Sequence, residues 1–395
     1  MSNKKLTILG VVAVFMVLWA VVQSRVSNRP AAEQDALVYL IQGLEPSGIG
    51  GIALGAGEDA VTLKRQENGF VVVNKDNYPA KTSEINDLIS KCLDIQTSEF
   101  VTDNPGNHED LEVTEDKART VIKFMTPEPN STILAGVVVG KTKELGQGTY
   151  VRLLSKDSAV SNKVYVASDV PWFSTGVMSY VEQELISAKR DDIESVVVTS
   201  ADGAYTLKTA EGGTDIVMEN VPPGKKLKSS DAQSVFTALT SLSCDDVRKK
   251  SSDLAFDKQY VCKLKDSTVY TLKIAQKDDK TYITSTSDFM DTTPVTKGSD
   301  VETEEELKAK EAKLLARDKA EEFTKAHQGW VYEIADWKAK NLTKGLSDLL
   351  EDEEKPKEEG SETPITVMPD LTAAPLFEDP NTVPAEDPNT AKAEP

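Results

Sequence analysis

The residues that most resemble a chemical motif are a glycine, a lysine and a threonine at the end of an apolar run. Gly140-Lys141-Thr142 ends like a phosphate-binding loop, and Gly136 stands near the place of that loop's first glycine. The motif requires four residues between its glycines, whereas here only three valines intervene. Valine also resists the positive φ angles that such a loop needs. We therefore predict a strand that ends in a turn, not a nucleotide site.

A second glycine pattern, Gly48 to Ala53, matches the dinucleotide-binding fingerprint by letter. That fingerprint needs a strand before it and a helix after it. Here Pro46 precedes the glycines and a strand-like run follows them. The pattern predicts an entry turn into the first strand.

Histidine and cysteine are too few and too scattered to suggest a metal site. The chain has two histidines, His108 in a polar stretch and His327 in a charged one. Neither has a second histidine or cysteine at ligand spacing, so we expect no zinc site. Cys92 belongs to an apolar stripe and is expected in a core. Whether Cys244 and Cys262 pair is left open by the sequence.

Other groups that could carry catalysis are also weakly supported. No G-x-S-x-G elbow is present to make a serine nucleophile. Pairs of adjacent aspartates are expected to be solvated caps at turns. These pairs are Asp191-Asp192, Asp245-Asp246 and Asp278-Asp279. We expect no enzyme activity, no cofactor, and no catalytic, cofactor-binding or metal-ligating residue.

The charge of the chain excludes one class of partner. The 395 residues carry a formal net charge of −20, and residues 351–395 supply half of it, with thirteen acidic residues against three lysines. Nucleic-acid phosphates would repel such a chain, so no nucleic-acid binding is expected. Eight prolines among the acids predict that residues 351–395 form a disordered tail.

The first 25 residues predict a single membrane anchor. Lys4 and Lys5 precede an apolar run over residues 6–22, which would reach ~25 Å as a helix, the short end of a membrane span. A cleaved signal peptide is the alternative, but no A-x-A-like site follows the run. Residues 1–25 are therefore expected to be a cytoplasmic stub and an uncleaved anchor, and residues 26–48 a stalk. Arg25 and Arg29 nearly balance the two lysines, so charge alone does not fix the orientation.

The rest of the chain predicts an α+β fold made of two tandem, mainly antiparallel repeats. The seam lies near Tyr180 to Lys208, where an apolar run, a glycine turn and Tyr205-Thr-Leu-Lys replay the residues from Ile49 to Lys64. The repeats are expected over residues 49–170 and 193–300, each with short strands and one helix. The first helix is expected to start at Thr82 or Ser83 and to bury a stripe from Ile85 to Leu93, and the second to run from Ser230 to about Ser243. Offsets between the copies are 144 at Leu63 and Leu207, 147 at Ile95 and Leu242, and 148 at Val121 and Val269. Because identity is low, chance similarity of two α+β halves remains the alternative.

Three further segments complete the expected organisation. Apolar residues at helical intervals after Pro171 predict a linking helix over residues 171–192. Residues 301–350 are expected to hold a charged helix, a strand from Gly329 to Ile334 and a closing helix. That strand is aromatic, and we expect it to pair with the sheet of the second repeat.

Several of these features together resemble the bacterial domain-of-unknown-function family 4340. The residues that carry the resemblance are a short N-terminal anchor, Gly148 to Arg152 with Lys163 to Val166, the seam from Leu185 to Val198, and Gly329 to Ile334 with Trp337 to Lys340. The resemblance covers about residues 6–350. The family's early Gly-Leu-x-x-Pro pattern is degraded here to Asp110-Leu-Glu-Val113.

The resemblance implies an auxiliary role in the cell envelope, beside ABC-type transport components of the gliding-motility kind. It supplies no catalytic residues. We expect a scaffold or auxiliary protein anchored in the inner (cytoplasmic) membrane through residues 6–22, with the bulk of the chain on the periplasmic side and integral-membrane transport components as partners. The alternative is an extracytoplasmic module that binds glycan or peptide in the cleft between the repeats.

Overall fold

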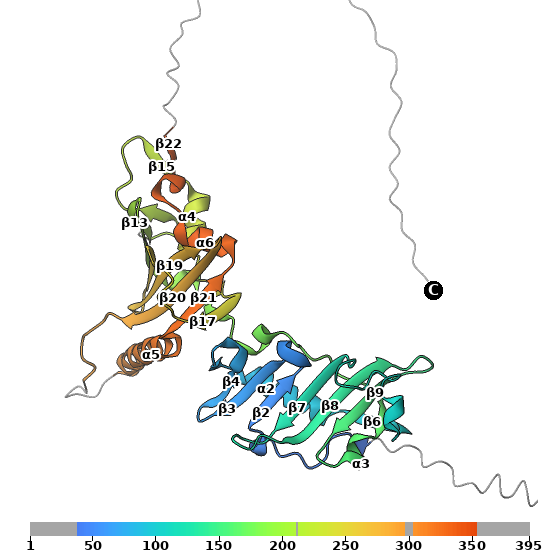
Figure 1. Ribbon diagram of the computed structural model, residues 1–395. Coiled ribbons are helices and arrows are strands. Elements are labelled where there is room, and N and C mark those ends of the chain that lie inside the picture. The colour runs from blue at the N-terminus through green and yellow to red at the C-terminus, as the bar shows by residue number, and fades with distance from the viewer. Residues whose placement is uncertain (1–37, 211, 297–302, 354–395) are drawn as a thin grey trace, which may run out of the picture. The chain divides into compact units, whose positions relative to one another are not determined.

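The computed structural model describes residues 38–210, 212–296 and 303–353, which form an α+β fold built on two large antiparallel sheets (Figure 1). This confirms the expected α+β class and the antiparallel sheets. The expected anchor over residues 6–22 and the tail from residue 354 lie outside the described residues. Within the described ranges, no helix is long and apolar enough to cross a membrane.

The first sheet belongs to residues 38–181, called here the N-subdomain. Its strand order is β1-β6-β10-β9-β8-β7-β2-β3-β4-β5. The bounds are β1 (Val38–Tyr39), β2 (Gly51–Leu54), β3 (Val61–Gln66), β4 (Gly69–Val72), β5 (Tyr78–Pro79), β6 (Gln96–Thr102), β7 (Thr120–Met125), β8 (Ile133–Thr142), β9 (Thr149–Leu154) and β10 (Val164–Ala167). The short helix α3 (Ser158–Ser161) joins β9 to β10.

Helix α2 (Thr82–Leu93) packs against the core of the N-subdomain. Its buried side chains recur at intervals of three, one and three residues, which places them on one face of a helix. They are Ile85, Leu88, Ile89 and Cys92. The opposite face of the sheet buries a smaller cluster around Val121, Val138 and Val164. Apolar side chains are therefore buried on both faces of the central strands.

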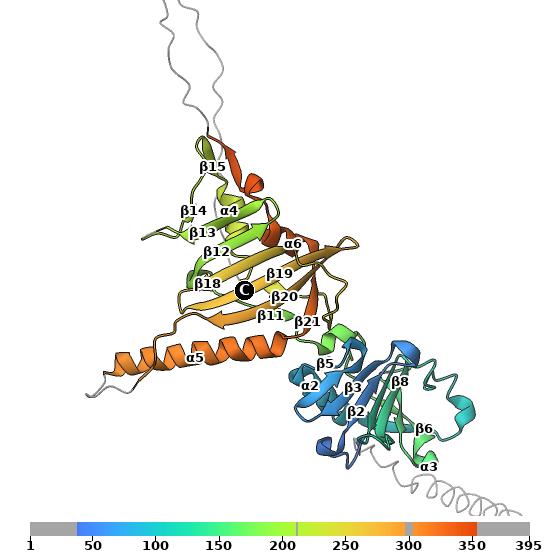
Figure 2. The same cartoon turned by 60° about the vertical axis from the view of Figure 1, so that its left-hand side comes forward.

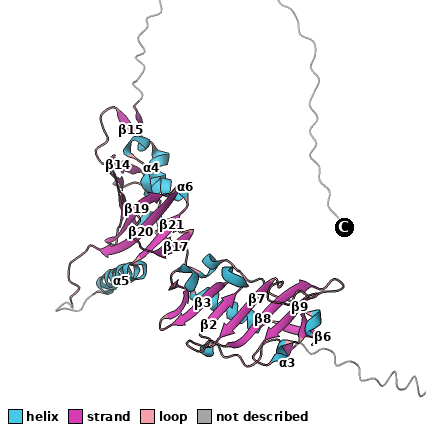
Figure 3. Cartoon of the chain, in the orientation of Figure 1, coloured by secondary structure: helices cyan, strands magenta, loops and turns pink. Residues whose placement is uncertain are grey.

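The second sheet belongs to residues 184–352, called here the C-subdomain. Its strand order is β14-β13-β12-β18-β19-β20-β21-β17. The bounds are β12 (Ile193–Ser200), β13 (Gly203–Thr209), β14 (Ile216–Met218), β17 (Asp246–Lys249), β18 (Lys258–Leu264), β19 (Thr268–Lys277), β20 (Lys280–Phe289) and β21 (Trp330–Ile334). Two small sheets pair β11 (Glu184–Ile186) with β16 (Leu242–Ser243) and β15 (Lys225–Leu227) with β22 (Leu350–Asp352). The helices are α4 (Ser229–Phe236), α5 (Glu304–His327) and α6 (Asp336–Thr343) (Figure 3).

Eight strands of the first sheet have the same order as the eight strands of the second, and only β1 and β5 have no counterpart there. From β4 through β2, β7, β8, β9 and β10 to β6, each strand of the N-subdomain matches one from β14 through β12, β18, β19, β20 and β21 to β17. The registers match as well. Thr120, Val139, Val151, Tyr165 and Phe100 lie side by side across one sheet, and Lys258, Ile274, Ile283, Tyr332 and Val247 lie side by side across the other. The two halves are thus built alike, strand by strand.

Each subdomain is closed in the same way around its first long helix. The N–H of Lys81, which precedes α2, donates to the carbonyl of Tyr180, and the N–H of Lys228, which precedes α4, donates to the carbonyl of Leu349; both distances are 2.8 Å. The accepting residues end two short 3-10 turns, η5 (Val177–Tyr180) and η7 (Leu346–Leu349). In each subdomain a C-terminal turn is therefore hydrogen-bonded to the residue that precedes the helix.

The long helix α5 covers part of an open sheet edge. β21 pairs only with Thr281, Tyr282 and Ile283 of β20, so the later half of β20 has no strand beside it there. The hydroxyl of Thr324 donates to the carbonyl of Ser287 and accepts from its N–H, at 2.6 and 2.7 Å. Figure 2 shows α5 lying alongside β20. A free strand edge invites pairing with another chain, and α5 blocks it.

The expected linking helix over residues 171–192 is wrong. This segment contains the turn η5, the strand β11 and the turn η6 (Arg190–Asp192). Phe173 and Tyr180 are buried while Trp172 is 76% exposed. The hydroxyl of Tyr180 donates to the carbonyl of Ser174 at 2.9 Å, which holds the chain in a compact loop. Among the apolar residues at helical spacing, the buried ones therefore pack separately along a loop, and they do not form one face of a helix.

Two helices end earlier than expected. The helix expected from Ser230 to about Ser243 ends at Phe236, where the hydroxyl of Thr237 donates to the carbonyl of Gln233. The closing helix expected to reach Leu350 ends at Thr343, before Gly345 and the turn η7. Both residue types favour helix ends, because a threonine hydroxyl hydrogen-bonds to nearby backbone and glycine loses the most backbone entropy in a helix.

The expected boundaries at the two ends of the fold also move. The stalk over residues 26–48 is too long, because Val38–Tyr39 pairs with β6 and Leu40 and Ile41 are buried. Residues 351 and 352, expected in the tail, belong to the fold, because β22 pairs with β15. The offset that matched Val121 with Val269 is wrong, since β7 corresponds to β18 and not to β19.

Candidate functional site

The junction between the two subdomains is an aromatic contact. Tyr78 of β5 lies 4.8 Å from Trp330 and 6.3 Å from Tyr332 between ring centroids, edge to face in both cases. The hydroxyls of Tyr78 and Tyr332 are 3.4 Å apart. Both tyrosines are buried, and burial raises the pKa of each. These side chains therefore fill the junction with apolar surface and one weak polar contact.

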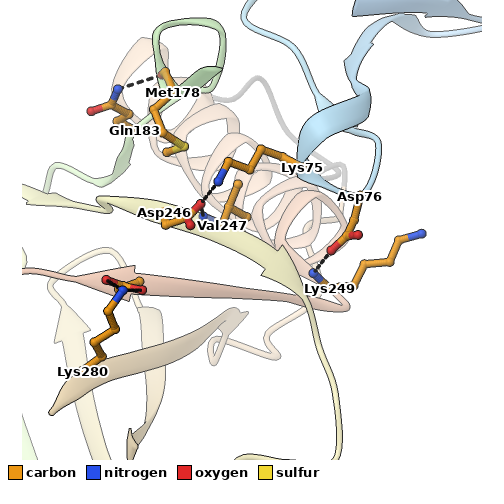
Figure 4. A network of polar contacts seen from close by, with 9 residues as sticks. Lys75, Asp76, Met178, Gln183, Asp246, Val247, Lys249 and Lys280 are labelled. Carbon is orange, nitrogen blue, oxygen red and sulfur yellow. Dashed lines mark hydrogen bonds and ion pairs between the residues drawn. The ribbon is translucent and has the colours of Figure 1, made fainter. Parts of the chain in front are cut away.

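Polar contacts flank the aromatic junction (Figure 4). The ammonium of Lys75 lies 2.5 Å from the carboxylate of Asp246. The carboxylate of Asp76 accepts from the backbone N–H of Lys249 at 3.0 Å. Asp76 and Asn77 both have positive φ angles, 54° and 63°, and this sharp turn presents the Asp76 side chain to the edge of β17. The turn of one subdomain thus satisfies the strand edge of the other.

His327, at the end of α5, contacts the junction through Tyr332. Its Nδ1 atom lies 2.6 Å from the hydroxyl of Tyr332, and its ring lies 4.2 Å from the ring of Phe323. Burial lowers the pKa of His327 to about 4, so the imidazole is neutral near pH 7. It holds Tyr332 in place, and among the described residues no acidic side chain contacts it in the way that a catalytic histidine uses.

A charged cavity of about 350 Å³ opens beside the junction on the C-subdomain. The polar side chains that line it come from β17, from the β19–β20 hairpin, from β21 and from the loop after β17. They are Asp246, Arg248, Asp253, Lys277, Asp278, Lys280, Tyr282 and Glu333. Arg248 lies over the ring of Tyr282 at 4.9 Å. Opposite charges alternate along the lining, so the cavity carries little net charge.

The charged groups of this cavity are paired with one another. Lys277 lies 2.8 Å from Asp253, and Lys280 lies 2.8 Å from Glu333. The hydrogen bond from Lys277, followed by that from Ser251, holds the pKa of Asp253 well below its usual range. The bonds to Asp253 and Glu333 raise the pKa values of Lys277 and Lys280. Acid–base catalysis needs pKa values near the working pH, and here they move away from it.

Two further cavities lie on the same subdomain. One of about 600 Å³ is bordered by residues 276–279 of the β19–β20 hairpin and by Asp336 and Lys340 of α6. A smaller one of about 150 Å³ is bordered by Lys273, Thr284, His327 and Trp330 among others. The larger one is bordered by no histidine or cysteine. The smaller one brings His327 near Lys250 and Lys273, but Nδ1 of His327 lies against the Tyr332 hydroxyl, which gives this imidazole a structural contact.

The glycines and the histidine that the sequence analysis considered for chemistry have structural roles. Gly136 and Gly140 lie within strand β8, where a Cβ atom would come within 2.6 Å of the Ile122 carbonyl and 2.4 Å of the Leu111 carbonyl. This confirms the predicted strand; the glycines allow neighbouring backbone to approach. His108 is buried, and its Nε2 lies 2.9 Å from the carbonyl of Asn162.

The three cysteines are free and buried. Burial raises the pKa of Cys244 and of Cys262 to about 12, and also raises that of Cys92. Thiols of this kind are poor nucleophiles. Across the described ranges, no group of three or more histidine, cysteine or acidic side chains is placed to hold a metal ion.

The sequence pointed to only half of the junction. The alternation of Trp330, Val331 and Tyr332 indicated a strand that needs cover on both faces. Nothing in the pattern around Tyr78 marked it as the covering group. Its one local signal is the Asp76-Asn77 pair before it, since these residue types tolerate positive φ and mark a turn.

A family match covers part of each subdomain. Residues 71–259, from β4 into β18, match the sequence model of a family described as "Domain of unknown function (DUF4340)". These residues form a DUF4340 domain. The resemblance noted from the sequence is thereby confirmed, whereas the DUF4340 description carries no association with gliding motility.

The DUF4340 match includes Lys75, Tyr78 and Asp246 of the junction but ends before β21. No curated protein and no solved structure matches the chain significantly. The family description names no activity, so the function of this DUF4340 protein must be argued from its own residues.

Proposed function

We propose that this DUF4340 protein is a membrane-anchored scaffold or auxiliary protein, and that it works with an ABC-type transport complex of the cell envelope. In this proposal residues 6–22 form a single-pass anchor in the inner membrane. The bulk of the chain lies on the periplasmic side, and integral-membrane transport components are its partners. The protein is not an enzyme, and it needs no cofactor.

The observation that carries this proposal is the state of the reactive side chains. Both histidines and all three cysteines of the sequence lie in the described residues. They are buried or half-buried and take part in packing or in structural hydrogen bonds. The cations of the charged cavity are held by neighbouring acids. Side chains that stabilise the fold in this way are not free for catalysis. This supports a protein that acts by binding partners through its surface.

The shared strand order supports a second part of the proposal, that the two subdomains are tandem repeats of one ancestral unit. Besides the sheets, the helices correspond at a constant offset of 147. Ile85, Leu88, Ile89 and Cys92 of the N-subdomain match Ala232, Val235, Phe236 and Leu239, and all eight are buried. On this view residues 171–181 complete the first repeat and residues 330–352 complete the second.

The position of the first described strand is compatible with the anchor. β1 begins at Val38 on the edge of the first sheet. Residues 23–37 would separate the anchor from this strand, and fifteen residues span at most about 50 Å. The N-subdomain would therefore be held near the membrane.

The alternative, a ligand binder with its site in the cleft between the repeats, is less well supported. Tyr78, Trp330 and Tyr332 pack against one another at the junction. The three cavities described above are bordered by residues between 246 and 343 and by none of the N-subdomain. We therefore retain the scaffold as the proposal.

Fractionation of the full chain tests the anchor. We expect the protein to remain in the membrane pellet after alkaline carbonate washing, with Met1 or Ser2 still present. A matched variant without residues 2–25 should become soluble. A soluble wild-type chain that begins near residue 24 would show that the segment is a cleaved signal peptide.

Crosslinking in native membranes tests the partnership. The full chain should recover an integral-membrane transport component, and the variant without residues 2–25 should recover much less of it. Recovery of the full chain with no transport component, at a crosslinking yield that captures known complexes, would contradict the scaffold role.

A further inference from the structure

The junction between the subdomains joins unlike surfaces. The turn of the N-subdomain after β4, with Lys75, Asp76 and Tyr78, meets the β17–β21 margin of the C-subdomain. Because the subdomains have the same strand order, each has both kinds of surface. One turn and one margin meet each other inside the chain. The equivalent margin is paired with β1 only at Gln96 and Thr97, and the equivalent turn is paired with β22 through residues 225–227.

The unused margin lies on the N-subdomain, along β6 and β10. The register places Tyr165 and Phe100 there, at the positions that Tyr332 and Val247 hold in the C-subdomain. Tyr332 and Val247 are 0% and 2% exposed, whereas Phe100 is 52% exposed. The rings of Phe100 and Tyr165 lie 5.8 Å apart, edge to face. The position that is covered at Val247 in one subdomain is open at Phe100 in the other.

An acidic group accompanies this margin in both subdomains. Glu99 lies beside Val166 in the first sheet, as Asp246 lies beside Glu333 in the second. Asp246 receives Lys75 from the other subdomain, whereas Glu99 pairs with Lys143 of its own subdomain at 2.6 Å. Both partners of this second pair are solvent-accessible, so an incoming cation can compete for Glu99.

The unused turn lies on the C-subdomain, between β14 and α4. Val72 and Met218 hold equivalent positions beside Leu63 and Leu207, and Lys81 and Lys228 both precede a helix. The turn between them includes Val221 and Lys225. Val217, at the end of β14, and Val221, in the turn, are 45% and 36% exposed. Lys225 and Lys226 follow, and they pair with Asp352 and Glu351 of β22.

We propose that this turn of one chain docks on the Phe100–Tyr165 margin of a second copy, repeating head to tail the contact that joins the subdomains within a chain. Val217 and Val221 would cover the two aromatic rings. Lys225, which lies 2.6 Å from Asp352 in the single chain, would exchange that solvent-accessible partner for Glu99. A contact between unlike surfaces does not close on itself at two copies, so it forms open chains or rings. This proposal does not depend on the membrane anchor or on a transport partner.

Thiol crosslinking of the full chain in a mild detergent tests the arrangement. The native cysteines are buried, so introduced ones react first. Phe100→Cys mixed with Val217→Cys should give covalent dimers with a short bismaleimide, whereas neither variant alone should. The double variant should give a ladder of higher species. Phe100→Cys mixed with Met290→Cys, whose residue is 61% exposed, is the matched control and should give none.

Sedimentation of the full chain provides a second readout. The wild type should associate with rising concentration, and Phe100→Asp should weaken that association at least tenfold without lowering the melting temperature. Dimers from Phe100→Cys alone would mean a symmetric contact, and a wild type that stays monomeric would mean that another protein or residues 1–37 cover the margin. Either result would overturn the proposal.

Discussion

The hydroxyl oxygens of Tyr78 and Tyr332 lie 3.4 Å apart, although 254 residues separate them in the chain. Tyr332 also contacts His327 through its hydroxyl, at 2.6 Å from Nδ1. One buried phenol thus connects the N-subdomain, the sheet of the C-subdomain and helix α5. Changes at this point should affect the stability of the whole described fold.

The Tyr78 ring should contribute more to stability than its hydroxyl. Tyr78→Ala removes a buried aromatic side chain, which we expect to cost about 3–5 kcal/mol in unfolding free energy. Tyr78→Phe loses only a long hydrogen bond and should cost about 1 kcal/mol or less. Urea unfolding of the full chain measures both values. Equal effects of the two substitutions would show that the ring does not pack as described.

Stability should fall in acid through His327. The pKa of His327 is about 4 in the folded protein and about 6.5 in an unfolded chain. Between these values the unfolded state binds the extra proton, so stability is full above pH 6.5 and decreases as the pH falls toward 4. His327→Phe should show a smaller decrease over this window. Urea midpoints at pH 7, 5.5 and 4.5 for both proteins give the comparison, in which parallel curves would rule out the titration of His327 as the cause.

The acidic tail and strand β22 should differ in importance. Removing residues 354–395 should leave the melting temperature almost unchanged, because β22 and η7 stay in place. Removing residues 346–395 takes away the fully buried Leu349 and the carbonyl that accepts from Lys228. Loss of a buried leucine alone costs about 2–5 kcal/mol. Calorimetry of the two truncations and the full chain decides this, and a large effect of the shorter cut would mean that the tail itself packs on the fold.

Gly140 should be structural and not a nucleotide ligand. A Cβ at Gly140 would lie 2.4 Å from the Leu111 carbonyl, so Gly140→Ala should cost about 1–3 kcal/mol through backbone displacement. Gly48→Ala is the matched control, since a Cβ there meets nothing within 4 Å. Unfolding curves with and without ATP should show no nucleotide-dependent shift for either protein. A shift in the wild type that Gly140→Ala abolishes would restore the phosphate-loop interpretation.

The parts of the fold that the sequence predicted are those with regular periodicity. The stripe of α2 predicted its buried face, and the apolar alternation of Gly329 to Ile334 predicted a strand that pairs with the second sheet, which is confirmed. Strand β6 was missed because its sequence, Gln-Thr-Ser-Glu-Phe-Val-Thr, is largely polar. Such a strand forms because two neighbours pair with it, which local pattern does not reveal.

The candidate site was harder to predict than the fold. Tyr78, Lys75 and Asp76 become important only through residues about 170 to 250 positions away. Long-range contacts of this kind leave no period in the sequence. Catalytic motifs, by contrast, can be looked for residue by residue in the sequence. The prediction that the protein is not an enzyme remains part of the proposed function.

The two closing hydrogen bonds, from Lys81 to Tyr180 and from Lys228 to Leu349, bear on how the chain folds as it is synthesised. The N-subdomain has all its segments once residue 181 has left the ribosome, so we expect it to fold while the second half is still being made. The C-subdomain must wait for its last strand, β22, to be synthesised. During that interval the finished first half presents Tyr78 without its partners, and a nascent chain is therefore most exposed to wrong pairing at the surface that will become its internal junction.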